Sequence, residues 1–260
     1  MTGKVSRAAG CLFLAILFGA PALFAQSDAE FTHPATDPAH DLTVKEFAKD
    51  VLLNFRGLIA RDNIKPLAVG GSLTGLAVIP EDDIRRYFGT GDRGAWTAPG
   101  RYLGSAPVIS GTSVFLFAAS RRSTDRRFRS FSYAFLQGVI VNASLVQATK
   151  AIVRRQRPDG TDRLSFPSGH TASSFLLATV LAEHYGIRAA IPGYLAASYV
   201  AATRVSGNRH HFSDVVAGAA IGCIAGHTVV RRMKSRKDGR VSWGITPVKG
   251  GFVASLSIQP

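Results

Sequence analysis

Apolar residues along this chain gather in long runs that are separated by polar clusters. The uncharged runs lie at residues 66–80, 102–120, 131–149, 171–182, 189–203 and 215–230. Within them polar and apolar residues do not alternate strictly, and Ala, Leu, Gly and Ser recur, which favours helices over strands. The pattern therefore predicts an all-α fold, built as an antiparallel helical bundle with polar loops.

A more polar region, residues 26–101, precedes the main runs. Its stretch "DLTVKEFAKDVLLNFRGLIAR" has Thr43 and Glu46 in capping-box spacing, followed by apolar residues at helical intervals. This pattern predicts an amphipathic helix over 43–61 that packs against the bundle. Residues 81–101 mix both charges with Gly and Pro, which indicates a loop or short helices.

The two ends of the chain carry different signals. Residues 1–25 combine Lys4 and Arg7 with an apolar stretch and small residues near Ala25, which is typical of a secretory signal peptide. A retained N-terminal anchor is the alternative, and in either case the chain that follows leaves the cytoplasm. Residues 231–260 are a basic segment and a tail whose β-prone residues predict a short hairpin.

The chain is strongly basic, with 31 Lys and Arg against 17 Asp and Glu and a formal net charge of +14. An excess of positive charge favours anionic partners such as phosphorylated molecules and acidic lipids. Nucleic acid is not favoured, because the sequence has neither a basic helix with interleaved aromatic residues nor zinc-finger spacing.

Several apolar runs are candidates for transmembrane helices, although some are shorter than the roughly 20 residues that a full span needs. Arginine-rich segments at 121–129 and 231–237 follow two of these runs, as cytoplasmic flanks do. Alternating the runs from 102 onward puts both segments on one side of the membrane. A secreted N-terminus agrees with this orientation only if 66–80 does not cross, and a crossing there would invert it. We expect a membrane protein of the cell envelope and keep a soluble periplasmic or secreted protein as the alternative.

Three polar clusters interrupt the apolar runs: "KAIVRRQRP" at 150–158, "PSGH" at 167–170 and "TRVSGNRHHFSD" at 203–214. The first follows one run, the second precedes another, and the third joins the last two. In an antiparallel bundle these positions fall at the same end. We therefore expect one site, built from distant parts of the sequence and placed on the non-cytoplasmic side.

The composition of the clusters suits a tetrahedral oxyanion. Lys150, Arg157 and Arg204 supply fixed positive charge, and a guanidinium offers paired donors to phosphate oxygens. Ser168 adds a hydroxyl, and Gly169 adds a backbone amide at the start of a helix, where unsatisfied amides attract anions. The set favours binding of a phosphate-like group at this end of the bundle.

Two histidines and a carboxylate in the same clusters indicate phosphoryl transfer. His210 and Asp214 are four residues apart, so on one helical turn the carboxylate can hold one imidazole nitrogen and fix the tautomer. An oriented imidazole can attack phosphorus while nearby cations stabilise the transition state. His170, in the facing cluster, is then placed to protonate the leaving oxygen and later to take a proton from water.

Together the clusters resemble the signature of the phosphatidic acid phosphatase type 2 and vanadium haloperoxidase superfamily. That signature is Lys, six residues, Arg-Pro; then Pro-Ser-Gly-His; then Ser-Arg, five residues, His, three residues, Asp. The matching residues are Lys150, Arg157, Pro158, Pro167 to His170, Arg204, His210 and Asp214, and Thr203 stands where the pattern has serine. The resemblance covers residues 102–230.

The resemblance implies a helical phosphatase core over 102–230 that needs no metal or other cofactor. It also implies that His210 is the nucleophile, that His170 is the acid and base, and that a phosphohistidine forms. The phosphate ligands that it implies are Lys150, Arg157, Ser168, Gly169 and Arg204. The implied substrate is a phosphomonoester or diphosphate of a lipid or isoprenoid.

Other functions remain open beside a lipid phosphatase. A soluble periplasmic acid phosphatase and a vanadium-dependent haloperoxidase would use the same residues. A metal-binding or structural membrane protein would instead use His170, His210, His211 and Asp214 as ligands. Clustered cations near those groups disfavour a bound cation, so this interpretation is the weakest.

Overall fold

The computed structural model describes residues 43–88, 94–238, 241–248 and 251–258. Its helical elements are α2 (Val44–Leu58), the 3-10 turn η1 (Arg61–Asn63), α3 (Ile64–Val78), α4 (Glu81–Phe88), α5 (Gly94–Leu103), α6 (Ala106–Ser120), α7 (Arg126–Val153), α8 (Gly169–Tyr185), α9 (Ile187–Ser206) and α10 (Phe212–Asp238). The strands β1 (Val241–Val248) and β2 (Gly251–Ile258) follow. The predicted signal segment at 1–25 lies outside the described residues.

The predicted helices are present, with boundaries set by local capping. In α2 the Thr43 side chain accepts from the Glu46 amide, and the Glu46 carboxylate accepts from the Thr43 amide. This capping box starts the helix where the sequence placed it, and η1 follows soon after the helix ends. The region 81–101 forms the short helices α4 and α5. The run predicted at 102–120 is divided, because α5 ends at Leu103 and α6 begins two residues after Gly104.

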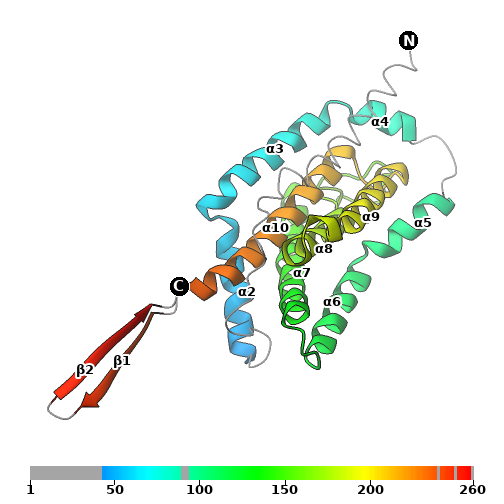
Figure 1. Cartoon of the computed structure of the whole chain (residues 1–260). Helices are drawn as coiled ribbons and strands as arrows, with labels where there is room; N and C mark the ends of the chain where they lie inside the picture. Colours follow the sequence, from blue (N-terminus) through cyan, green and yellow to red (C-terminus); the bar gives the residue numbers. More distant parts are fainter. Residues whose placement is uncertain (1–42, 89–93, 239–240, 249–250, 259–260) are drawn as a thin grey trace.

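The centre of the bundle is the close contact between α8 and α10, which both begin at the same end (Figure 1). Gly218, Gly222 and Gly226 recur every fourth residue on α10 and face α8. A Cβ atom on Gly222 would lie 2.9 Å from the amide nitrogen of Leu176 and closer still to the carbonyl of Ala172. The glycines therefore let the two backbones approach closely, as small residues do in paired membrane helices.

Helices α2 and α3 cover one side of this centre, against α7 and α10 (Figure 1). Buried polar contacts fix them in place. The Tyr133 hydroxyl of α7 donates to Asp50 of α2 at 2.7 Å, and the Asn63 amide of η1 donates to the Thr228 hydroxyl of α10 at 2.8 Å. Such pairs satisfy polar groups that would otherwise be costly inside the bundle.

Helix α5 covers the other side, where it packs against α9 and the start of α8. Glycines again mark the tight positions. A Cβ atom on Gly100 would overlap the side chain of Thr203, and one on Gly104 would lie 2.8 Å from the carbonyl oxygen of His170. The α5 backbone is therefore held directly beside the "PSGH" cluster.

Of the described helices, α7 and α10 are each long and apolar enough to cross a membrane, and the α5–α6 pair, bent by 41°, adds a third span if it acts as one. Helix α3 has 15 residues and is shorter than a full span. Apolar side chains are exposed on α3 and α6, among them Leu76, Val78, Val114 and Phe115. An apolar exterior of this kind suits contact with lipid.

The segment after α10, where the sequence predicts a hairpin, contains β1 and β2. They pair antiparallel, with Val241 opposite Ile258 and Val248 opposite Gly251. Figure 1 shows the paired strands extending away from the helices.

Candidate active site

The structure brings the three polar clusters together at one end of the bundle. Lys150 lies in the last turn of α7, Ser168 is the N-cap of α8, Arg204 lies in the last turn of α9, and Asp214 lies in the first turn of α10. His210 occupies the loop between α9 and α10. A backbone hydrogen bond of 2.9 Å from the Ser168 amide to the Asp214 carbonyl joins two of the clusters directly.

Arg157 is anchored along one edge and faces His210 with the other. Its Nε donates to the Asp162 carboxylate at 2.7 Å, and its Nη1 donates to the Arg209 carbonyl at 3.1 Å. The same Nη1 lies 3.4 Å from His210 Nε2. The guanidinium charge is thus fixed next to the imidazole.

Lys150 and Arg204 add two buried cations to the site. The Lys150 ammonium donates to the Leu164 carbonyl. Arg204 is only 6% exposed, and its Nε has no hydrogen-bond partner among the residues that the structure describes. Burial and repulsion from Arg209 and Arg157 lower the pKa of Arg204 to about 10. A bound oxyanion would relieve this repulsion and give the guanidinium its missing acceptor.

The His210 ring is held in one tautomer. Its Nδ1 lies 2.7 Å from the Ser165 carbonyl oxygen, which can only accept, so Nδ1 carries the hydrogen. In the neutral ring the lone pair then sits on Nε2, the atom that faces Arg157. Burial, assisted by Arg157 and Lys150, lowers the pKa of His210 to about 4 although Asp214 opposes the shift. The ring is therefore neutral and nucleophilic at neutral pH.

Asp214 lies next to the His210 nitrogen that the sequence predicted it to contact. Asp214 Oδ2 is 3.7 Å from His210 Nδ1, within ion-pair distance but farther than the Ser165 carbonyl oxygen at 2.7 Å. The carboxylate accepts from the Ser165 hydroxyl at 2.5 Å, the His211 amide at 2.9 Å and Arg155 Nη1 at 2.9 Å. Asp214 thus acts on His210 directly, by its charge, and also through Ser165, whose hydroxyl it binds and whose carbonyl orients the ring.

His170, the second residue of α8, is held by α5. Its Nε2 lies 3.1 Å from the Arg101 carbonyl oxygen, so Nε2 carries a hydrogen and Nδ1 is the nitrogen left to exchange a proton. Burial, and then the positive charge of Arg204, lowers the pKa of His170 to about 4. The His170 ring is therefore neutral at neutral pH.

The start of α8 supplies the hydroxyl and amide that the sequence predicted. The Ser168 side chain caps the helix by accepting from the Thr171 amide at 3.5 Å, and the Thr171 hydroxyl donates to Ser168 Oγ at 3.0 Å. Gly169 is the first helical residue, and the Phe166–Pro167 peptide bond before it is cis. The first amides of a helix attract anions, which suits this end of α8 to an oxyanion.

Sequence reasoning missed a group of residues behind His210. Arg155 Nη2 lies 2.6 Å from Glu81 Oε2, and Glu81 Oε1 accepts from the Ser213 amide at 3.0 Å. These contacts join α4, the α7–α8 loop and α10, which are far apart in the chain, so no local spacing signals them. The Ser165 and Arg101 carbonyls were equally hidden, because any residue type supplies a carbonyl.

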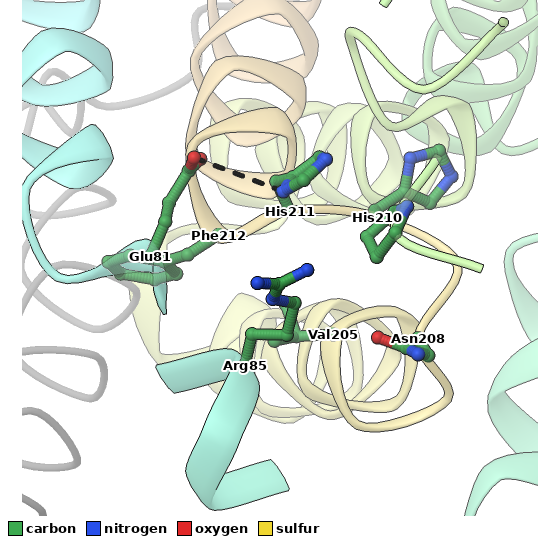
Figure 2. Close-up of a pocket in the computed structure, with 8 residues that line it drawn as sticks. Glu81, Arg85, Val205, Asn208, His210, His211 and Phe212 are labelled. Atoms are coloured by element: carbon green, nitrogen blue, oxygen red, sulfur yellow. Dashed lines mark ion pairs between the residues drawn. The ribbon is translucent and has the colours of Figure 1, made fainter. Parts of the chain in front are cut away.

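A small pocket borders His210 on the side of α4. It is lined by Glu81, Arg85, Pro158, Val205, Asn208, His210, His211 and Phe212. Figure 2 shows Glu81 facing His211, whose Nδ1 lies 3.9 Å from Glu81 Oε2. None of the residues that the resemblance implies as phosphate ligands lines this pocket, so its polar groups lie beside the His210 ring rather than the cationic cluster.

These features define a class of protein, a helical bundle with a cationic, histidine-containing oxyanion site at one end. The family model of the PAP2 superfamily matches residues 129–238 of this chain. The matched range contains every predicted site residue, from Lys150 to Asp214. The resemblance inferred from the three clusters is thereby confirmed.

The chain is 31% identical over 234 residues to the lipid A 1-phosphatase of Porphyromonas gingivalis, an alignment that covers 85% of this chain and 50% of that protein. This chain thus spans half the length of that relative. Its structure is similar to the crystal structure of Aquifex aeolicus LpxE, with 23% identity, a TM-score of 0.48, and coverage of 58% and 93% of the respective chains. It is also similar to a transmembrane phosphatidylglycerolphosphate phosphatase of Bacillus subtilis, with 17% identity, a TM-score of 0.46, and coverage of 75% and 98%.

Proposed function

We propose that the chain is a phosphatase that hydrolyses a phosphomonoester of a membrane lipid through a phosphohistidine intermediate. The observation that carries the proposal is the buried His210 ring, whose Nδ1 donates to a carbonyl while its Nε2 faces a fixed guanidinium. The match of residues 129–238 to the PAP2 superfamily model supports the same reaction class. The lipid A 1-phosphatase that the chain resembles supports a lipid substrate.

In the first half-reaction the substrate phosphate binds among Lys150, Arg157 and Arg204, next to the start of α8. His210 Nε2 attacks phosphorus in line with the leaving oxygen, so a P–N bond forms as the P–O bond to the lipid breaks. The three cations stabilise the charge on the equatorial oxygens. His170 donates a proton from Nδ1 to the leaving oxygen. The negative charge of the bound phosphate raises the pKa of the His170 imidazole enough for the ring to carry that proton.

In the second half-reaction water attacks the phosphohistidine from the side that the lipid alcohol has left. Neutral His170 takes a proton from this water at Nδ1, the P–N bond breaks, and inorganic phosphate and the free His210 ring are regenerated. Asp214 does not contact phosphate in this scheme. It is a positioning residue, because it holds Ser165 and thereby the carbonyl that fixes the His210 tautomer.

Phosphate release by the purified chain in detergent tests the proposal, with lipid A, phosphatidic acid, an isoprenoid phosphate and a soluble phosphomonoester as substrates. We expect a preference for lipid substrates and a loss of at least about a thousandfold in kcat for His210→Ala. The matched control is His227→Gln, which removes a histidine that lies in α10 and contacts Glu183.

Trapping of the intermediate gives a second readout. Brief reaction with a ³²P-labelled lipid should leave an acid-labile, alkali-stable phosphoprotein in the wild type and none in His210→Ala. Full activity without His210, or a label on another residue, would overturn the mechanism. A preference for the soluble ester would overturn the lipid assignment alone.

A further inference from the structure

A carboxylate from outside the family-matched range lines the pocket that borders His210. Glu81 lies in the first turn of α4, well before residue 129, and its side chain is 10% exposed. Its Oε2 lies 2.6 Å from Arg155 Nη2, and its Oε1 accepts from the Ser213 amide and hydroxyl. One side chain therefore binds both a partly buried cation and the residue that precedes Asp214.

These contacts continue without a break to His210. Arg155 donates to Asp214 Oδ1 at 2.9 Å, and Asp214 Oδ2 accepts from the Ser165 hydroxyl at 2.5 Å. The Ser165 carbonyl then accepts from His210 Nδ1 at 2.7 Å. Every link is within hydrogen-bond distance, so a shift of the Arg155 guanidinium would be transmitted to the ring.

The charges explain why two carboxylates share one guanidinium. Asp214 is fully buried, and an uncompensated carboxylate there would be costly. Arg155 compensates it, and the planar guanidinium can serve a second carboxylate without leaving the first. Burial opposes the charge on Arg155, but its hydrogen bond to Glu81 and the charge of Asp214 outweigh burial and raise its pKa. Together the two carboxylates and Arg155 carry a net negative charge next to the cationic cluster.

We infer that Glu81 is a positioning residue for phosphoryl transfer, acting on His210 through Arg155, Asp214 and Ser165. The inference rests on the proposed function and extends it to the N-terminal region of the chain. Glu81 does not touch the phosphate. It fixes the guanidinium that holds Asp214 and, through Ser213, the first turn of α10.

The variant Glu81→Gln separates this role from a structural one. It removes the charge and keeps an acceptor, so we expect kcat to fall about tenfold because the ring loses its orientation. KM and the dissociation constant for vanadate, a phosphate analogue, should stay the same or decrease, because the site becomes more positive. Loss of structure alone would instead raise both KM and the dissociation constant for vanadate. The control is Asp82→Asn on the same helix, whose exposed carboxylate pairs with Arg85 and should leave kcat and KM unchanged.

A double-mutant cycle tests the route through Arg155. The kcat of Glu81→Gln combined with Arg155→Gln should equal that of Arg155→Gln alone, because the second change acts on a link that is already broken. Additive losses, or an unchanged kcat in Glu81→Gln, would overturn the inference. If Glu81→Gln does not accumulate in folded form, Arg155→Lys keeps the positive charge and loses the forked donor geometry of the guanidinium. A wild-type kcat in Arg155→Lys would also overturn the inference.

The proposed function and the role of Glu81 fail in different measurements. Failure of the proposed function appears in the wild type, as absent phosphate release or absent phosphohistidine. Failure of the Glu81 inference appears only as a difference between variants. Vanadate binding, followed by the shift in Tm, reports on the site even if the lipid substrate has been misassigned.

Discussion

At the scale of single residues, the chemistry of the site depends on carbonyl oxygens as much as on charged side chains. The Ser165 carbonyl determines which nitrogen of His210 carries the hydrogen, and the Arg101 carbonyl does the same for His170. Because each carbonyl accepts and never donates, the opposite nitrogen of each ring is the one left for phosphorus or for a leaving oxygen.

The two buried imidazoles make stability depend on pH in a definite direction. Burial lowers the pKa of both His170 and His210 to about 4 from an ordinary 6.5, so between these values the unfolded chain binds more protons than the folded one. The stability that they contribute is fully present above pH 6.5 and is lost as pH falls toward 4. We expect Tm in detergent to decrease over that window and vanadate to reduce the decrease. His170→Asn should show a shallower dependence, and an equally steep one would contradict the assignment.

The residues that carry charge could be predicted from the sequence, whereas their contacts could not. Lys150, Arg157 and Arg204 stand at recognisable spacings near helix ends, and the structure places them together. Asp214 does lie near His210, but the Ser165 carbonyl is the nearer partner of His210 Nδ1, and spacing along the chain gives no signal for a backbone acceptor. Glu81 was missed because its partners are distant in the chain and its own surroundings look like an ordinary helix start.

At the scale of elements, the apolar runs predicted the helices but not their full lengths. Helix α7 begins at Arg126, before the uncharged run, because Asp125 caps it by accepting from the Arg127 amide at 2.8 Å. Charged residues at a helix end do not stop the backbone pattern, so counting uncharged residues underestimates its length. The glycine spacing in the last run was the available signal for the α8–α10 contact.

That contact gives a matched pair of substitutions. Gly222→Ala places a methyl group against the α8 backbone and should destabilise the protein by about 1–3 kcal/mol, since an overpacked position forces the helices apart. Gly75→Ala, on α3, meets no neighbouring atom within 4 Å and should have no destabilising effect. Thermal or denaturant unfolding in detergent distinguishes the two. Equal effects would mean that α8 and α10 are not packed this closely.

At the scale of the whole molecule, the bundle separates two chemically different ends. The site residues lie at the ends of α7 and α9 and at the starts of α8 and α10, while an arginine-rich turn joins α6 to α7 at the other end. If α7 crosses the membrane, a lipid phosphate reaches the site from one face only. By the positive-inside rule we expect the arginine-rich turn on the cytoplasmic side, provided that residues 66–80 do not cross the membrane.

Cysteine labelling tests this orientation. In a background without Cys11 and Cys223, Arg163→Cys places a thiol in the exposed α7–α8 loop at the site end, and Arg122→Cys places one in the exposed turn before α7. A membrane-impermeant maleimide applied to intact spheroplasts should label the first variant at once and the second only after permeabilisation. The reverse pattern would place the site in the cytoplasm, and labelling of both would argue against a span by α7.

The contact of α5 with His170 determines which positions of α5 tolerate substitution. The acceptor is a main-chain oxygen 69 positions away, so replacing the Arg101 side chain leaves it in place. Substitution is instead restricted at Gly100 and Gly104, whose missing Cβ atoms let α5 lie against Thr203 and the His170 backbone. The position of His170 therefore depends on two glycines, Gly100 and Gly104. The side chain of Arg101, whose carbonyl oxygen is the partner of His170, can be replaced.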